Sequence, residues 1–338
     1  MILYRRPGAD RNFADKLNAI LWPRLLPNFF DNDASVQLLG IGSVLDGRHN
    51  THGVKIVTHG VKIVAGSGYG GYTAPPTLDR SWVIHWVRGP RTARVLGLPP
   101  SLGLGDPAAL LPLAGMVGTE VLHSGSQIGF MPHFESAARG AWESAASLAG
   151  VTIIDPRGEP QDIIAAIHRC TLLLSEALPG VIVADALRVP WIAIQPIIPA
   201  HHPEWQDWAD TLQLRIVFRR LPPSSFLEDL NRSGLCDFHG GRWFLDRHGG
   251  KLRGVLSGLF AERAARALCF AAAATPQLSQ DLALQTSQER MMQAVTALRR
   301  DPFCGYVRVP SQSVALADVA ASLAANATPQ GVARVASA

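Results

Sequence analysis

The chain has 338 residues, of which 47% are hydrophobic, so it can bury one large core or two medium ones. Its formal net charge is only +4, with 31 basic against 27 acidic residues, and we expect no nucleic-acid partner. The four cysteines lie far apart, which argues against a disulfide scaffold and against a structural zinc site. The N-terminus lacks the apolar core of a signal peptide, and the apolar stretches elsewhere are too interrupted to span a membrane. We therefore expect a cytoplasmic enzyme with two domains.

The N-terminal residues predict a strand at 1–5 and a helix at 13–26, in which Phe13 and Leu17 recur at helical spacing. Asp15 near the start of this helix is typical of a cap or of a partner for the helix dipole. Binding of an acceptor is the second interpretation of Asp15.

Residues 36–43 predict the next strand. The heptapeptide THGVKIV then occurs twice without change, at residues 51–57 and 58–64. A repeat this short cannot form a solenoid, and we interpret it as a local duplication. One copy can continue into the sheet, while the other lengthens a loop or the strand, so His52 and His59 are poor candidates for ligands.

A glycine-rich loop at residues 65–71 matches the spacing of a dinucleotide-binding motif. However, Pro75 and Pro76 prevent an immediate helix, and no acidic residue follows at the distance that a ribose requires. We reject a nicotinamide site and expect this loop, with Gly68, to border a cleft between domains.

Arg88 follows a predicted strand at residues 82–87, and Pro90 suits the first turn of a short helix after it. A guanidinium beside a helix N-terminus is a good clamp for phosphate or carboxylate. The alternative for Arg88 is a salt bridge between domains. Arg91 lies on the same helix, where a surface charge and a substrate contact are both open. Asp106 before a proline is typical of a turn cap, and a role in the active site is its second interpretation.

The second half of the chain begins with a predicted strand from residue 127, followed by Pro132 and then His133 on a loop. A further strand at residues 151–154 and an amphipathic helix at residues 160–168 follow. His133 thus stands just after the first predicted strand of the second half.

Residues 170–196 predict a compact βαβ unit, with strands at 171–174 and 191–195 and a helix at 181–188. Continuously apolar strands of this kind are typical of a parallel sheet covered on both faces. Ligands of such sheets gather at the carboxyl ends of the strands, so backbone N–H groups in the turn at 176–180 could hold an anion. A plain crossover without a ligand is the alternative.

The C-terminal third predicts helices at residues 252–274 and 281–300 and a frayed end at 311–338. We expect the two helices to pack back across the domains, with an amphipathic contact to a membrane as the alternative. His201 and His202 are adjacent, but the sequence offers no further metal ligands at a recognisable spacing, and we predict no metal site.

Three segments together resemble the polysaccharide pyruvyl transferase family: NFAD at the N-terminus, WVRGPRTARVLGL with the later GDPA, and SEALPG followed by VIVADALRVPW. The resemblance covers most of residues 1–210 and is strongest to exopolysaccharide ketal pyruvyltransferases. The chain departs from the family pattern at Pro179, where the family has histidine, and at Arg11 and Ala14, where it has glycine.

The resemblance implies an α/β fold of GT-B type, in which two Rossmann-like domains face each other across a cleft. The expected boundaries are an acceptor-side domain at residues 1–115, a donor-side domain at residues 120–275, and C-terminal helices with a tail at residues 281–338.

The implied activity is transfer of a pyruvyl group from phosphoenolpyruvate to a terminal hexose of a lipid-linked exopolysaccharide repeat unit, which forms a carboxyethylidene ketal and releases phosphate. This chemistry needs a general acid, a base for the hydroxyls and fixed positive groups for the donor. No cofactor is expected besides the donor substrate, and the lipid-linked acceptor implies peripheral contact with the inner membrane. We predict His133 and Glu176 as catalytic residues and the following as substrate-binding residues: Asn12, Asp15, Gly68, Arg88, Arg91, Leu178, Pro179 and Gly180.

Two other functions stay open. A nucleotide-sugar glycosyltransferase would have the same two-domain fold, because fold alone does not determine function. A catalytically impaired scaffold for exopolysaccharide assembly would explain Pro179, which removes both the family histidine and a backbone N–H.

Overall fold

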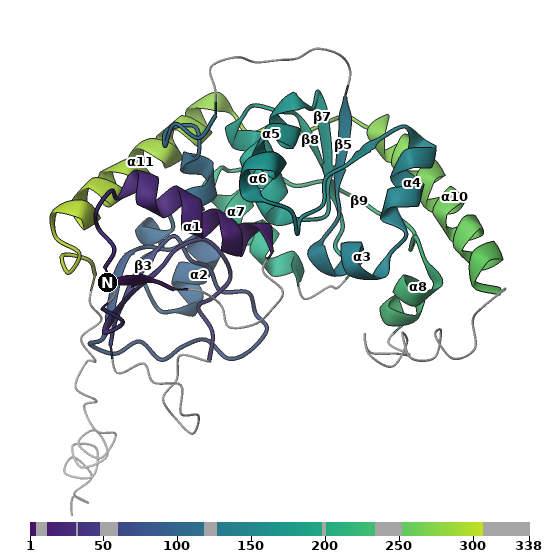
Figure 1. Cartoon of the computed structure of the whole chain (residues 1–338). Coiled ribbons are helices and arrows are strands. Elements are labelled where there is room, and N and C mark those ends of the chain that lie inside the picture. Colours follow the sequence, from purple (N-terminus) through teal and green to yellow (C-terminus); the bar gives the residue numbers. More distant parts are fainter. Residues whose placement is uncertain are drawn as a thin grey trace, which may run out of the picture.

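The computed structural model describes the chain at residues 1–4, 12–31, 33–47, 60–117, 127–197, 201–233 and 252–306. Over these residues the protein is a mixed α/β structure with two separate parallel sheets, which lie side by side with helices around them (Figure 1). The predicted α/β class is therefore confirmed.

The first sheet has the strand order β1-β2-β3-β4 and is parallel throughout. Alternate side chains of its strands bury on opposite faces, because neighbouring residues of a strand point to opposite sides. Leu38 and Ile63 pack in the same cluster as helix α1, whereas Leu39 and Val64 pack with residues of helix α2. The strands and helices of this part are β1 (Ile2–Leu3), α1 (Phe13–Leu25), β2 (Val36–Leu39), β3 (Val61–Ala65), β4 (Trp82–Trp86), α2 (Pro90–Val95), η2 (Pro100–Leu102) and η3 (Pro107–Leu110).

Only part of the duplicated heptapeptide belongs to the described residues. The end of its second copy forms strand β3, where Leu38 pairs with Ile63 and Leu39 with Val64. This confirms that one copy continues into the sheet. The first copy, with His52, and also His59 lie outside the described residues.

The second sheet has the order β6-β5-β7-β8-β9 and is also parallel. Leu174 and Ile192 bury on the side of α4 and α10, while Leu173 and Trp191 bury on the side of α5 and α6. Burial on both faces explains why these strands are continuously apolar. The elements are β5 (Ile128–Met131), α3 (Phe134–Arg139), α4 (Trp142–Ala149), β6 (Thr152–Ile153), α5 (Pro160–Arg169), β7 (Leu172–Ser175), α6 (Leu178–Ala186), β8 (Trp191–Ile194), α7 (His202–Thr211), β9 (Phe218–Arg219), α8 (Phe226–Arg232) and α10 (Leu252–Ala272).

One predicted boundary in this sheet is wrong. Helix α6 was expected to begin at residue 181, but it begins at Leu178, so part of the predicted turn is the first helical turn. Pro179 fits there because the first N–H groups of a helix have no intrahelical partner, and a residue without an N–H loses nothing.

The two sheets share one hydrophobic cluster, which runs from Leu17 and Trp22 of α1 to Val181 of α6 and Trp208 of α7. The helix α11 (Asp281–Arg300) returns to the first sheet, as Figure 1 shows, and contacts β4 and η3. Beyond it, Tyr306 forms an antiparallel bridge with Ile84 of β4. The prediction that this helix packs back across the chain is confirmed.

Among the described residues, no helix has the length and apolar content needed to cross a bilayer. The predicted domain boundaries stay a prediction, and the predicted frayed end at 311–338 lies outside the described residues.

Candidate active site between the two sheets

A cavity of about 280 Å³ is lined by residues from both halves of the chain. Its wall combines the start of α1, the loop after β2, the end of β4, the loop after β5, the start of α6 and the residue before α7. These are the carboxyl ends of parallel strands and the N-termini of helices, where ligands of such sheets bind. Six of the residues predicted from the sequence line it: Asn12, Asp15, Arg88, His133, Leu178 and Pro179. A second cavity of about 290 Å³ adjoins it and shares Asp15, Ile41 and Val44.

Two histidines and a glutamate meet at the cavity wall. The Nδ1 atom of His133 lies 3.5 Å from Oε2 of Glu135, and Nε2 of His201 lies 3.1 Å from the same oxygen. The two imidazole rings are 4.3 Å apart between centroids, and the hydroxyl of Tyr72 is 2.6 Å from Nδ1 of His201. Burial by itself would raise the pKa of Glu135, but the contacts with His133 and His201 outweigh it and hold that pKa well below its ordinary value.

The start of α1 is held by a local cap. The side-chain oxygen of Asn12 accepts a hydrogen bond from the backbone N–H of Asp15 at 3.0 Å, so Asn12 and not Asp15 is the N-cap. Both residues also line the cavity, and their predicted role in substrate binding stays a prediction.

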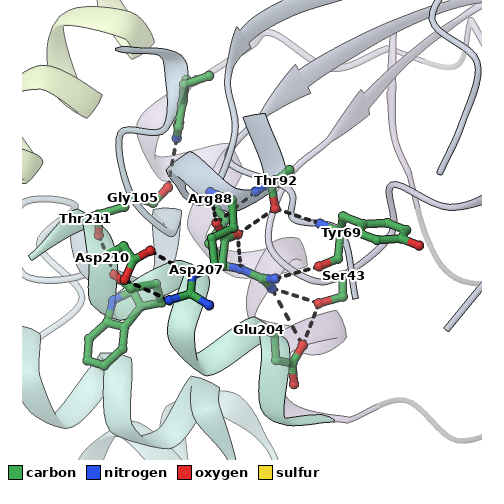
Figure 2. Close-up of polar contacts among 12 residues, drawn as sticks. Ser43, Tyr69, Arg88, Thr92, Gly105, Glu204, Asp207, Asp210 and Thr211 are labelled. Carbon is green, nitrogen blue, oxygen red and sulfur yellow. Dashed lines mark hydrogen bonds and ion pairs between the residues drawn. The ribbon is translucent and has the colours of Figure 1, made fainter. Parts of the chain in front are cut away.

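Arg88 is almost completely buried, and its guanidinium is engaged by protein groups from both halves of the chain (Figure 2). Nε donates to Asp207 at 3.3 Å, Nη1 donates to Ser43 at 2.8 Å, and Nη2 donates to the carbonyl of Tyr69 at 3.2 Å. Glu204 lies 3.7 Å from Nη1. The structure thus forms the salt bridge between the two halves that was the alternative interpretation of Arg88, while the residue still lines the cavity.

Asp207 of α7 holds the first turn of α2 from the other side of this interface. One carboxylate oxygen accepts from the backbone N–H groups of Arg91 and Thr92 at 2.9 and 3.0 Å, and the other accepts from the Thr92 hydroxyl at 2.5 Å. The N-cap residue Gly89 makes no side-chain cap of its own. A Cβ atom on Gly89 would lie 2.1 Å from the carbonyl oxygen of Asp207, so this approach requires glycine.

Four residues predicted for the site do not line the cavity. Gly68 packs against Arg88, where a Cβ would lie 2.2 Å from Cζ of the guanidinium. Arg91 is half-exposed and pairs with Asp210 at 2.8 Å. Gly180 packs against Met131 and Ser175, with no room for a Cβ.

Glu176 is the fourth predicted residue that does not line the cavity, and its carboxylate accepts hydrogen bonds from protein groups. It accepts from the backbone N–H of His133 at 3.0 Å, from the Ser136 hydroxyl at 2.9 Å and from the backbone N–H of Ile197 at 2.9 Å. Glu176 is buried and ties the loop that carries His133 to the end of β7. Its predicted contact with a substrate hydroxyl stays a prediction, but these bonds assign it a role in positioning His133.

Asp106 is a further titratable group of the cavity. It caps the helix η3 through a bond from the backbone N–H of Ala108 at 3.0 Å. Burial raises the pKa of Asp106 to about 6, against the smaller opposing effects of that bond and of Arg88. A carboxyl group of this kind in a cavity is a candidate proton donor near neutral pH.

Sequence reasoning missed Tyr72, Glu135 and the partners of Arg88. Glu135 follows His133 by two residues, which is the one local signal that could have drawn attention to it. Tyr72 has no such signal, because its partner His201 is 129 residues away.

Comparison with known proteins gives one informative relative. The chain is 36% identical over 314 residues to the succinoglycan biosynthesis protein ExoV of Rhizobium meliloti (strain 1021), and the match covers 86% of this chain and 96% of that protein. No family model matches the chain. Identity of this level over nearly the full length of the relative shows common descent: the chain belongs to the family of the succinoglycan biosynthesis protein ExoV.

Proposed function

We propose that this protein transfers a pyruvyl group from phosphoenolpyruvate to a terminal hexose of a lipid-linked exopolysaccharide repeat unit. The observation that carries the proposal is that predicted site residues from three distant segments line one cavity: Arg88 after β4, His133 after β5 and Leu178 at the start of α6. A relative that acts in succinoglycan biosynthesis supports a role for the chain in making an exopolysaccharide.

The reaction proceeds in two stages, an addition to the double bond of the donor followed by replacement of its phosphate. A proton adds to C3 of phosphoenolpyruvate and leaves C2 cationic, and one sugar hydroxyl then attacks C2 and gives its proton to a base. Phosphate leaves in the second stage, a second hydroxyl attacks the same carbon, and its proton is also released. The products are a carboxyethylidene ketal and inorganic phosphate.

The titratable groups of the cavity supply the proton transfers in this proposal. His133 is the group predicted from the sequence. Asp106, for which a role in the active site was the second interpretation, joins it because it is buried against the same cavity with its pKa raised to about 6. A group that is protonated in part near neutral pH suits the protonation of C3.

The start of α6 supports binding of an anion there. The backbone N–H of Leu178 is the first of the helix and donates to no group among the described residues, and it lies at the positive end of the helix dipole. Pro179 contributes no N–H, so this end of the helix offers fewer donors than one with histidine at that position.

The acceptor in this proposal is lipid-linked, which requires the protein to meet the cytoplasmic face of the inner membrane peripherally. Helices that could span the membrane are not found among the described residues, which is compatible with such contact.

The test is release of inorganic phosphate from phosphoenolpyruvate, with and without a lipid-linked oligosaccharide acceptor, by the native chain and by Pro179→His. We expect release that depends on the acceptor, and a ketal in the product by mass spectrometry. Activity only in Pro179→His would mean that the native site is disabled. If neither protein releases phosphate and the native chain transfers sugar from a nucleotide-sugar, the proposal is wrong and the protein is a glycosyltransferase.

A further inference from the structure

Three potential metal ligands converge at the wall of the cavity. One ligand atom each from His133, Glu135 and His201 lies within 4.8 Å of the others. Protein nitrogen and oxygen ligands bind Zn²⁺ at about 2.0 to 2.2 Å, so two ligands of one ion are roughly 3.0 to 3.6 Å apart. The separations from Glu135 Oε2 to the two histidine nitrogens, 3.5 and 3.1 Å, fall in this range.

Each of these groups is oriented by a further partner, as metal ligands commonly are. The Tyr72 hydroxyl contacts Nδ1 of His201 and leaves Nε2 directed at Glu135. Arg139 lies 3.8 Å from Oε1 of Glu135, while Oε2 faces the histidines. Glu176 holds the backbone of His133. All three ligand residues line the cavity, so a bound ion would have coordination positions open to a substrate.

The charges around the cavity also favour binding of a cation. The described residues that line it include the carboxylates of Asp15, Glu135 and Glu204 and the carboxyl group of Asp106, whereas Arg88 is the one lysine or arginine among them. The guanidinium of Arg88 is already engaged by Asp207, Ser43 and Tyr69. A donor that carries a carboxylate and a phosphate would bring about three negative charges into this wall, which is unfavourable unless a further cation accompanies it.

We propose that His133, Glu135 and His201 bind a divalent transition-metal ion, with Zn²⁺ as the best match to two imidazoles and a carboxylate. The ion takes an oxygen of the anionic donor into an open coordination position, a part of the inference that rests on the proposed function. In this arrangement His133 is a ligand, and the proton for C3 of the donor comes from Asp106.

The first experiment measures metal binding alone. Untagged protein is freed of metal with a chelator and titrated with Zn²⁺ by calorimetry, and with Co²⁺ by visible absorption. We expect one tight equivalent per chain, lost in His133→Ala and His201→Ala and kept in His168→Ala, a histidine on α5 outside the cavity. Tyr72→Phe removes only a hydroxyl and should weaken binding about 10-fold to 100-fold.

Tight binding that is unchanged in a folded His133→Ala, His201→Ala double variant would overturn the site, as would absence of a tight equivalent in the native protein. Circular dichroism verifies that the variants fold, and Tyr72→Phe tests the site if the histidine variants do not.

The second experiment measures binding of phosphoenolpyruvate to the metal-free and Zn²⁺-loaded protein. Tighter binding to the loaded protein by 10-fold or more, lost in His201→Ala, would support the bridging role. Equal affinity for both forms would overturn that role. If Zn²⁺ binds at one equivalent but phosphoenolpyruvate binds neither form, the metal site stands and the proposed function fails.

Discussion

Replacing Asp207 by alanine should destabilise the protein more than any change at a surface charge, because this buried carboxylate of α7, in the second half of the chain, holds both Arg88 and the first turn of α2 in the first half. It receives hydrogen bonds from Arg88, from the backbone N–H groups of Arg91 and Thr92, and from the Thr92 hydroxyl. Breaking a buried ion pair by removing one partner costs about 3 to 5 kcal/mol, and losing a helix cap costs about 1 kcal/mol. Since these terms overlap, we expect a loss of about 4 kcal/mol in the free energy of unfolding.

The assay is urea unfolding followed by circular dichroism, with Asp210→Ala as the matched control on the same helix. Asp210 pairs with Arg91 at 2.8 Å, but both side chains are more than a third exposed, so solvent screens the pair. Its removal should change the free energy of unfolding by less than about 1 kcal/mol. Asp207→Asn keeps one acceptor oxygen for α2 and should lie between the two.

A loss below about 1 kcal/mol in Asp207→Ala, or equal losses in Asp207→Ala and Asp210→Ala, would refute the view that Asp207 joins the two halves. Glu204, which lies 3.7 Å from the same guanidinium, would then be the partner that compensates Arg88.

Two further predictions concern helices α6 and α8, which follow strands of the second sheet in the chain. Gly180→Ala would place a Cβ 2.5 Å from Sδ of Met131, and thermal unfolding should reveal a loss of about 1 to 3 kcal/mol; unchanged stability would show that α6 can shift. Burial, with a smaller effect of the Glu176 charge, raises the pKa of Glu228 to about 7 from an ordinary value of 4.5. The folded protein then holds this proton more tightly than the unfolded chain, so the associated stability is complete below about pH 4.5 and is lost as the pH rises through about 7, by roughly 3 kcal/mol. The unfolding free energy of Glu228→Gln should therefore fall less between pH 5 and pH 8 than that of the native protein, and an equal fall in both would contradict the assignment.

Much of the fold could be predicted because the strands are buried on both faces. Such strands are continuously apolar, as in Trp191–Ile194, and the bounds of α11 agree with the predicted helix at residues 281–300. The start of α6 was missed because Pro179 reads as a turn in the sequence, although a proline is equally at home in the first turn of a helix.

The candidate site was predictable only in part. Local patterns placed Arg88 and His133 at strand ends and Leu178 in the turn before a helix, and the cavity does join them. Local patterns do not contain the partners of these groups. The carboxylate that engages Arg88 lies 119 residues away in Asp207, and His201 reaches Glu135 across 66 residues.

The amino-acid sequence by itself therefore determined the order of strands and helices and the positions of reactive side chains at their ends, because hydrophobic periodicity and turn residues act over a few neighbours. Only the tertiary structure decided that Arg88 is held in a buried salt bridge and that two histidines and a glutamate share one wall of the cavity. The Arg88 contact joins the two halves of the chain, and the second group brings together the loop after β5, helix α3 and the residue before α7, so both depend on how distant elements pack and not on neighbouring residues.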